Sequence, residues 1–391
     1  MDNRILDIDV QDFIKSNIKS DLEKLALSKN PFPEIDFPLL LSQISAASKA
    51  REKLPTWFNA SGIYYPSRIS MEQTSSEITA AYKSRIVSGE NAADLTGGFG
   101  VDTYFFSKKF DYIWHCESQQ ELSEIAAHNF KILGADNIKC FAGDGMKFLQ
   151  QSSRHFDLLY IDPSRRNDAK GKVFLLSDCL PDVPSNLDKY FEYSDKILIK
   201  TSPILDISAA LRELSNVSEI HVVSVKNEVK ELLFLMERGY DNDIKVSAVD
   251  LHQNDEETLE FILGSESNEM YSHPMQYLYE PNAAIMKAGG FSYLCARFAV
   301  TKLHPHSHLF TSDEVLAFPG RRFRIDDVYD YGKSAAKELS QLKQANITTR
   351  NFPETPEQIK KRLKLKDGGS KYLFFTTGPD DKKIVLLCSK I

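Results

Sequence analysis

The stretch Asn91-Ala-Ala-Asp-Leu-Thr-Gly-Gly-Phe-Gly-Val-Asp102 decides the fold. A short apolar run, Ala92–Leu95, ends in a glycine-rich turn, and amphipathic sequence resumes at Val101. This order predicts a strand that leads into a helix through a turn where the backbone closely approaches another group. The glycines do not follow the G-x-G-x-x-G spacing of dinucleotide-binding enzymes. After Asp94, the small residues are Thr96, Gly97, Gly98 and Gly100.

Short β-rich runs alternate with helical stretches from residue 91 to about residue 238. We expect strands at Ala92–Leu95, Tyr112–Glu117, Asn137–Ala142, Phe156–Ile161, Lys196–Lys200, Glu219–Val225 and Leu232–Met236. We expect helices at Val101–Lys109, Gln119–Leu133, Gly145–Gln150, about Val173–Tyr190 and Leu205–Leu214. This alternation predicts an α/β fold with a parallel seven-stranded sheet that binds ligands at the carboxyl ends of its strands. The last two strands are too close in sequence for a crossover helix, so the seventh should be antiparallel.

The flanking segments have patterns of their own. Residues 1–62 show an amphipathic helical period, with helices expected from about Val10 to Leu25 and from about Pro38 to Pro55. Thr74 and Glu77 have the spacing of a capping box, which predicts a helix that begins there. Ile244–Leu251 and Thr258–Leu263 are expected to form a hairpin, and the last 70 residues a small α/β unit.

The charge of the chain is unevenly distributed. The net charge is −7, yet the residues from Lys287 onward hold 19 Lys and Arg against 11 Asp and Glu. A basic C-terminal third predicts a face that binds a polyanion, although solvated surface lysines would give the same count.

The sequence also gives an expectation about the cellular compartment of the protein. The start, Met1-Asp-Asn-Arg, lacks the features of a signal peptide, and no apolar run approaches the ~20 residues of a membrane span. The five scattered cysteines indicate reduced core thiols and neither a zinc site nor disulfides. We therefore expect a cytoplasmic protein without a structural metal.

Acidic residues follow three further strands. Glu117 ends the second strand, Asp144 and Gly145 follow the third, and Asp162-Pro-Ser-Arg-Arg166 follows the fourth. Together with Asp94–Asp102, these positions resemble the successive motifs of class I S-adenosylmethionine (SAM) methyltransferases. The resemblance implies that the glycine turn, Asp94, Thr96 and Asp102 contact the cofactor. It also implies that Glu117 accepts from ribose hydroxyls, that Asp144 accepts from the adenine amine, and that Asp162 lies beside the methyl group. Thr74, Ser75 and Ser76 could hold the methionine carboxylate at a helix N-terminus, or could simply cap that helix.

The chain from about residue 60 onward resembles a bacterial group, common in Bacteroidetes, in which a methyltransferase domain precedes ferredoxin-like and THUMP-like regions. The residues that carry this resemblance are Glu72–Glu77, Asp94–Asp102, Asp162–Arg166, Tyr279–Ala283, Ser307–Asp313, Phe318–Arg321 and Arg362–Gly369. It implies a helical segment at 1–62, a SAM-dependent methyltransferase domain at 63–268, a ferredoxin-like segment at 269–320 and a THUMP-like domain at 321–391. THUMP domains are associated with RNA-modifying enzymes, so the resemblance implies an RNA substrate, tRNA or rRNA.

The motif after the fourth strand departs from the [DN]-P-P-[YF] pattern of enzymes that methylate exocyclic amines. Arg165 occupies the aromatic position, where a guanidinium can stack on a base or clamp a phosphate. The D-P-P-R motif of uracil-C5 methyltransferases is more similar, but those enzymes need a cysteine nucleophile. No cysteine lies near this motif or after the fifth strand, so methylation of carbon is discounted. Asp162 and Arg165 are the catalytic candidates, with Pro163, Ser164 and Arg166 beside the substrate. Alternatively, Arg165 and Arg166 form structural salt bridges to acids such as Asp168.

Other candidates have structural alternatives as well. Lys200 and Ser202, at the end of the fifth strand, border the substrate or belong to a capped turn. Arg321, Arg322 and Arg324 suit phosphates and bases, or form an edge strand with outward charges. The triple His304-Pro-His306-Ser-His308 lacks a fourth ligand for a metal, and a loop role is favoured.

The sequence therefore predicts a SAM-dependent methyltransferase that acts on RNA through a basic C-terminal module. Asp162 would orient the acceptor, or take its proton if the acceptor is an amine. A methyltransferase for protein or small molecules, and a non-catalytic RNA-binding protein, are the alternatives. The sequence leaves the oligomeric state unknown.

Overall fold

The computed structural model describes residues 1–165, 175–253, 255–265 and 269–391, with the backbone alone of Arg165. The chain divides into two compact units. The first comprises Met1–Ser218 with Leu232–Asn242, and the second comprises Glu219–Glu231 with Asp243–Ile391.

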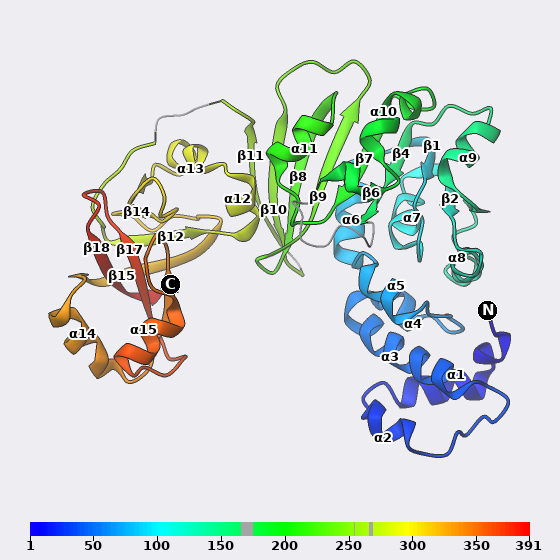
Figure 1. The fold of residues 1–391 in the computed structure, drawn as a ribbon, viewed down its shortest axis with the longest axis horizontal. Coiled ribbons are helices and arrows are strands. Elements are labelled where there is room, and N and C mark those ends of the chain that lie inside the picture. Colours follow the sequence, from blue (N-terminus) through cyan, green and yellow to red (C-terminus); the bar gives the residue numbers. More distant parts are fainter. Residues whose placement is uncertain (166–174, 254, 266–268) are drawn as a thin grey trace. The chain divides into compact units, whose positions relative to one another are not determined.

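The first unit is built on strands β1 (Gly89–Asp94), β2 (Phe110–Glu117), β3 (Ile138–Ala142), β4 (Leu158–Ile161), β7 (Lys196–Thr201) and β9 (Glu228–Glu237). Their order in the sheet is β9-β7-β4-β1-β2-β3. Figure 1 shows β7, β4, β1 and β2 side by side. All of these pairs are parallel except β7 with β9, which is antiparallel. With β8 (Val217–Val225), all seven expected strands are present and the predicted reversal of the last one is confirmed.

Helices follow most of these strands, as the alternation predicts. They are α7 (Val101–Phe106), α8 (Gln120–Ile132), α9 (Gly145–Gln151), α10 (Val183–Phe191) and α11 (Ile207–Glu213). Of the helix expected over about Val173–Tyr190, residues 173 and 174 lie outside the described residues, and the expectation of one continuous helix is wrong for residues 175–182. The short elements η2 (Leu176–Asp178) and β6 (Cys179–Leu180) come first, and β6 pairs with β5 (Ser164–Arg165). The helix begins only after Asp182, whose carboxylate caps it, with a proline in the first turn where no N–H is needed.

The N-terminal segment is helical, as expected. It contains η1 (Asn3–Leu6), α1 (Ile8–Ser16), α2 (Leu22–Ala26), α3 (Phe37–Lys53) and α4 (Pro55–Asn59). The single helix expected over residues 10–25 is two helices, because the chain ends one helix at Asn17 and caps the next with Asp21. The helices share one hydrophobic cluster with residues that follow them in the first unit, such as Tyr64, Phe99 and Ile125.

The predicted capping box at Thr74 is wrong. Thr74 ends helix α5 (Arg68–Gln73), and Ser76 caps helix α6 (Glu77–Arg85) by accepting from the backbone N–H of Thr79. Glu77 has another partner, because its carboxylate accepts from the backbone N–H and the hydroxyl of Thr56.

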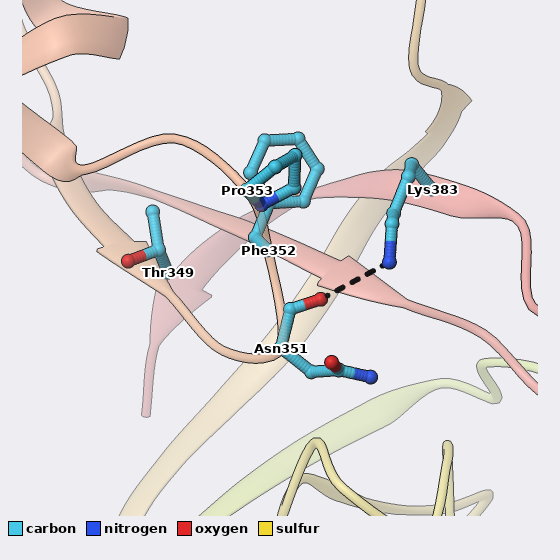
Figure 2. A pocket seen from close by; sticks show the side chains of 5 residues that line it. All are labelled: Thr349, Asn351, Phe352, Pro353 and Lys383. Atoms are coloured by element: carbon cyan, nitrogen blue, oxygen red, sulfur yellow. Dashed lines mark hydrogen bonds between the residues drawn. The ribbon is translucent and has the colours of Figure 1, made fainter.

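The second unit contains the expected hairpin, β10 (Lys245–Leu251) with β11 (Glu256–Ile262), and β8 runs parallel to β10. Its larger sheet has the order β13-β14-β12-β15-β18-β17-β16. The strands are β12 (Tyr277–Pro281), β13 (Thr301–Lys302), β14 (Phe310–Ser312), β15 (Gly320–Asp330), β16 (Asn346–Thr349), β17 (Lys371–Thr377) and β18 (Lys383–Lys390). The helices are α12 (Ala283–Ala288), α13 (Phe291–Phe298), α14 (Lys333–Leu339), η3 (Ser340–Leu342) and α15 (Pro356–Leu363). A cavity of about 460 Å³ lies in this unit beside Lys383 (Figure 2).

Two further expectations concern burial. Four cysteines are buried, but Cys140 is exposed, so the prediction of core thiols is wrong for that residue, which lies on the edge strand β3. Within the described ranges, no helix has both the length and the apolar character that crossing a membrane requires.

Candidate functional site

The turn between β1 and α7 is held together by Asp94. One carboxylate oxygen accepts from the backbone N–H of Thr96 at 3.0 Å, and the other accepts from the Thr103 hydroxyl at 2.6 Å. The hydroxyl of Thr96 in turn accepts from the backbone N–H of Asp162 at 2.7 Å, which ties the end of β4 to this turn. Asp94 is almost wholly buried, and burial raises the pKa of its carboxyl to about 7.

The three glycines of this turn differ in what surrounds the position that a Cβ would occupy. A Cβ at Gly97 would collide with the ring of His115, and one at Gly100 with the ring of Phe130. Those two positions are therefore required by internal packing. Gly98 has a φ of +55°, and the nearest atom to a Cβ there would be 3.9 Å away. The surface above Gly98 is thus open, as a cradle for an extended ligand requires.

Glu117 lies next to this open position, at the end of β2. Its carboxylate accepts from the backbone N–H of Gly98 at 2.9 Å and from that of Gln119 at 2.7 Å. An ionised carboxylate offers about four lone-pair positions, so Glu117 can accept further hydrogen bonds.

Asp144 follows β3 and is exposed, and its carboxylate caps α9 by accepting from the backbone N–H of Lys147. Gly145 packs so closely on the turn that a Cβ would lie 2.6 Å from the Leu95 carbonyl oxygen. Because β3, β2, β1 and β4 are adjacent and parallel, their carboxyl ends share one edge of the sheet. That edge brings Asp144, Glu117, Asp94 and Asp162 together.

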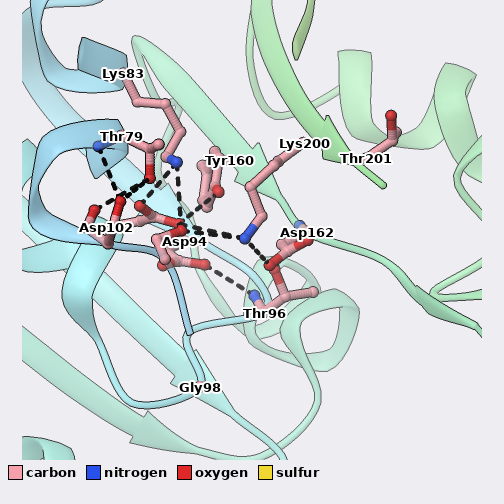
Figure 3. Close-up of polar contacts among 12 residues, drawn as sticks. Thr79, Lys83, Asp94, Thr96, Gly98, Asp102, Tyr160, Asp162, Lys200 and Thr201 are labelled. Atoms are coloured by element: carbon pink, nitrogen blue, oxygen red, sulfur yellow. Dashed lines mark hydrogen bonds and ion pairs between the residues drawn. The ribbon is translucent and has the colours of Figure 1, made fainter. Parts of the chain in front are cut away.

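A chain of alternating charges runs inward from Asp162, as Figure 3 shows. Lys200 Nζ lies 2.5 Å from Asp162 Oδ2 and 3.8 Å from Asp102 Oδ2. Lys83 Nζ, on α6, lies 3.2 Å from Asp102 Oδ1. The hydroxyls of Ser75 and Tyr160 both donate to Asp102 Oδ2, at 2.8 and 2.7 Å. Both lysines also donate to the Ser75 oxygen.

Exposure falls along this chain. The Asp162 side chain is 36% exposed, that of Lys200 11%, that of Asp102 9% and that of Lys83 0%. Only Asp162 can therefore reach a substrate easily. Burial would raise the pKa of Asp102, but Lys83, Lys200 and the two hydroxyls outweigh it and lower that pKa overall. Burial raises the pKa of Asp162, and the ammonium of Lys200 opposes this shift.

The remaining predicted residues of this region are placed as follows. Pro163 is partly buried, Ser164 is exposed, and the half-buried Ser202 accepts from the backbone N–H of Ile204. Lys200 belongs to the ion network, so the alternative reading as an ordinary turn lysine is wrong. Arg166 and Asp168 lie outside the described residues, as does the side chain of Arg165.

Sequence reasoning missed Lys83, Thr103 and Tyr160. Each lies on an element that the sequence does predict. Thr103 directly follows Asp102, and Tyr160 precedes Asp162 by two positions, but neither position reveals which carboxylate the hydroxyl contacts. The weak signal for Lys83 is its place next to Ala80, Ala81 and Tyr82, on a helix that packs into the core.

The candidate RNA-docking arginines on β15 have partners within the protein. Arg321 Nε donates to Glu280 Oε2 at 2.5 Å, and Arg350 pairs with the other oxygen of this buried carboxylate at 2.6 Å. Arg324 pairs with Asp326 at 3.0 Å, and Arg322 donates weakly to the Leu316 carbonyl oxygen. Intramolecular contacts thus hold all three side chains.

The histidine triple is a structural loop. His304 Nδ1 accepts from the backbone N–H of His306 and from Asn351 Nδ2, and His304 Nε2 lies 2.9 Å from Asp381. His308 stacks on Phe291, and burial lowers the pKa of its imidazole to about 4. The His304 and His306 rings contact each other, with centroids 5.5 Å apart, while His308 stacks on Phe291. Among the described residues, none of the three histidines belongs to a group that could hold a metal ion.

Comparisons with known proteins identify the family. A ferredoxin-like domain model matches residues 277–319, and a THUMP-like domain model matches residues 320–390. A solved structure from Porphyromonas gingivalis W83, classed as a methyltransferase, is 33% identical and has a TM-score of 0.90. The alignment covers 100% of this chain and 99% of that one.

Other similarities are partial. An rRNA methylase from Streptococcus thermophilus is 14% identical, with a TM-score of 0.30, over 41% of this chain and 93% of that one. The tRNA m1G37 methyltransferase of M. jannaschii is 14% identical, with a TM-score of 0.30, over 44% of this chain and 50% of that one. Similarity at this level supports no inference, and no curated protein matches the chain. The full-length match and the two domain matches decide the matter: the chain belongs to the family of the P. gingivalis protein, with a class I methyltransferase fold followed by a ferredoxin-like and a THUMP-like domain.

Proposed function

We propose that this protein transfers a methyl group from SAM to RNA, either tRNA or rRNA. The observation that carries the proposal is the set of carboxylates at the carboxyl ends of β1, β2 and β4, of which Glu117 accepts from the open backbone of Gly98. The full-length similarity to a protein classed as a methyltransferase supports it.

The residues present fit SAM. Glu117 would accept from the ribose hydroxyls, since two backbone N–H groups already hold its carboxylate in place. Asp144, exposed at the neighbouring strand end, would accept from the adenine amine. Gly98 would lie against the methionine part of the cofactor, while Thr74, Ser75 and Ser76, which precede α6, would hold its carboxylate. When bound, SAM supplies a methyl group that its sulfonium already activates.

Asp162 would accept a hydrogen bond from the acceptor group of the substrate. Its carboxylate is partly exposed, and the ammonium of Lys200 at 2.5 Å favours the ionised form. Because SAM is already activated, holding the acceptor in line with the methyl group is the main task. Arg165, Pro163 and Ser164 would contact the substrate next to this carboxylate.

The RNA part of the proposal rests on the C-terminal region. A THUMP-like domain matches residues 320–390, and the chain from Lys287 onward carries 19 basic against 11 acidic residues. Such a surplus attracts RNA in a salt-dependent way. We propose a methyltransferase domain at residues 63–268, with residues 269–320 and 321–391 as the regions that present the substrate.

The test combines cofactor binding and methyl transfer. Calorimetry with SAM and single-turnover methylation of total tRNA and rRNA, with labelled SAM, are measured on the parent protein and on Asp162→Asn. We expect the variant to bind SAM like the parent and to methylate roughly 10²-fold more slowly. Asp188→Asn, an exposed change on α10, is the control and should behave like the parent. Parental methylation by Asp162→Asn would reject the role of Asp162, and absence of SAM binding by the parent would reject the proposed activity.

A further inference from the structure

The cavity in the second unit lies where three segments meet. Thr349 ends β16, Asn351, Phe352 and Pro353 form the loop that follows, and Lys383 begins β18. Its volume of about 460 Å³ lies within the range of pockets that hold small molecules. Its walls combine an aromatic ring and a proline with an amide, a hydroxyl and an ammonium, a mixture suited to a ligand with both a flat apolar part and an anionic part.

Lys383 supplies a cation that has no carboxylate partner among the residues that the structure describes. Its ammonium donates to the Thr377 hydroxyl at 2.5 Å and to the Asn351 carbonyl oxygen at 3.4 Å, the contact drawn in Figure 2. An ammonium has three donors, so one is left for a ligand. Within the described ranges no acid forms an ion pair with Lys383. The nearby acids Asp380, Asp381 and Glu354 pair with His273, His304 and Arg362 respectively.

The loop is fixed before any ligand binds. Asn351 has a φ of +51°, a conformation that asparagine tolerates better than most residues. Its side-chain amide donates to His304 Nδ1 at 3.0 Å, and its carbonyl oxygen accepts from the Thr377 hydroxyl at 2.6 Å. A site held in this way loses little conformational entropy on binding. The histidine loop thus gains a role as the support of this wall of the cavity.

We propose that this cavity binds one nucleotide unit of single-stranded RNA. The phosphate accepts from Lys383, and the base or sugar packs on Phe352 and Pro353, a pairing of cation and apolar surface typical of single-strand recognition. The inference rests on the proposed function, in which RNA is the substrate. It also moves the expected docking contact away from Arg321 and Arg324, whose charges are already paired with Glu280 and Asp326.

The experiment measures binding of a labelled single-stranded oligoribonucleotide to the full chain by fluorescence anisotropy, over a range of salt concentrations. We expect Lys383→Gln to weaken binding about 5- to 10-fold at low salt. The slope of log affinity against log salt concentration should become smaller in magnitude by about 0.7, because one contact with a single-strand phosphate is lost. Lys383→Arg should bind like the parent. Lys382→Gln, a matched change at the exposed neighbouring residue, should have less than a twofold effect.

If Lys383→Gln binds RNA like the parent, or if Lys383→Arg loses binding as Lys383→Gln does, the proposal fails. Displacement of the RNA by a low concentration of AMP would show a site for free nucleotides and would also overturn it. Should Lys383→Gln unfold at a lower temperature than the parent, Pro353→Asp takes its place. Pro353 is exposed and lines the cavity, so this change puts a negative charge beside the phosphate and should weaken binding at least as much. A parent that binds SAM but no RNA would reject the RNA substrate itself, a result distinct from failure at this cavity alone.

Discussion

Replacing Lys83 with methionine should lower the free energy of unfolding by about 3 kcal/mol. The side chain is 0% exposed and its Nζ lies 3.2 Å from Asp102, so the change leaves a buried carboxylate without its closest cation. Removing one partner of a buried ion pair costs about 3–5 kcal/mol. We expect the lower end because Asp102 keeps two hydroxyl donors and Lys200 at 3.8 Å. Methionine fills a similar volume, so any cavity left by the change should add little.

The assay is urea denaturation at pH 7, with stability extrapolated to water. Lys49→Met is the control, because Lys49 forms an ion pair of 2.6 Å with Glu72 at the surface, where solvent screens the pair, and this change should destabilise the protein much less than Lys83→Met does. Asp102→Asn should also lower the free energy of unfolding. In the double variant Lys83→Met with Asp102→Asn, the loss of this free energy should be smaller than the sum of the two single losses by at least about 1.5 kcal/mol. Strict additivity, or a loss for Lys83→Met no larger than for Lys49→Met, would refute the ion network as described.

Three further results are expected. Glu117→Ala should weaken SAM binding strongly in calorimetry, with the fold unchanged by circular dichroism; parental affinity would contradict the role of Glu117. Burial raises the pKa of Asp94 from 3.8 to about 7, so the folded protein keeps a proton there that the unfolded chain releases, and stability falls as the pH rises through this window. The asparagine of Asp94→Asn cannot ionise, so the free energy of unfolding of this variant should fall less than that of the parent between pH 4 and pH 7. Urea denaturation measures both, and equal falls would contradict the raised pKa of Asp94. Arg321→Gln should lower the melting temperature more than Arg324→Gln, since Arg321 pairs with the buried Glu280 while Arg324 is 61% exposed; equal effects would contradict this ranking.

The strands and the acids at their ends could be predicted because both leave local signals. A buried parallel strand reads as a short apolar run, and an acid directly after it must lie at the carboxyl edge of the sheet. The positions of Glu117 and Asp162 at this edge could therefore be predicted without knowledge of the tertiary structure. The start of α10 was harder to predict, because Leu175, Leu176, Cys179 and Leu180 recur at helical spacing but lead into Pro181 and the cap at Asp182.

The ion network and the arginine pairs could not be predicted, because they depend on which strands are neighbours. Lys83 is separated from Asp102 by β1 and the glycine turn, and only the packed fold brings their charges within 3.2 Å. Arg321 lies directly opposite Glu280 in the pairing of β12 with β15. A cluster of arginines in sequence does not reveal the buried carboxylate that neutralises it.

The N-terminal helices are bonded to the segments that carry the ion network. The side-chain amide of Gln43, on α3, bonds to both the backbone N–H and the carbonyl oxygen of Tyr65, and Asn129 on α8 does the same for Tyr64. Thr56 on α4 donates twice to Glu77, in the first turn of the helix that carries Lys83. A chain shortened to begin near residue 63 would lose these anchors and leave Lys83 without its support. The sheet region of this chain is therefore not expected to fold well by itself, and a shortened version should retain the first 60 residues.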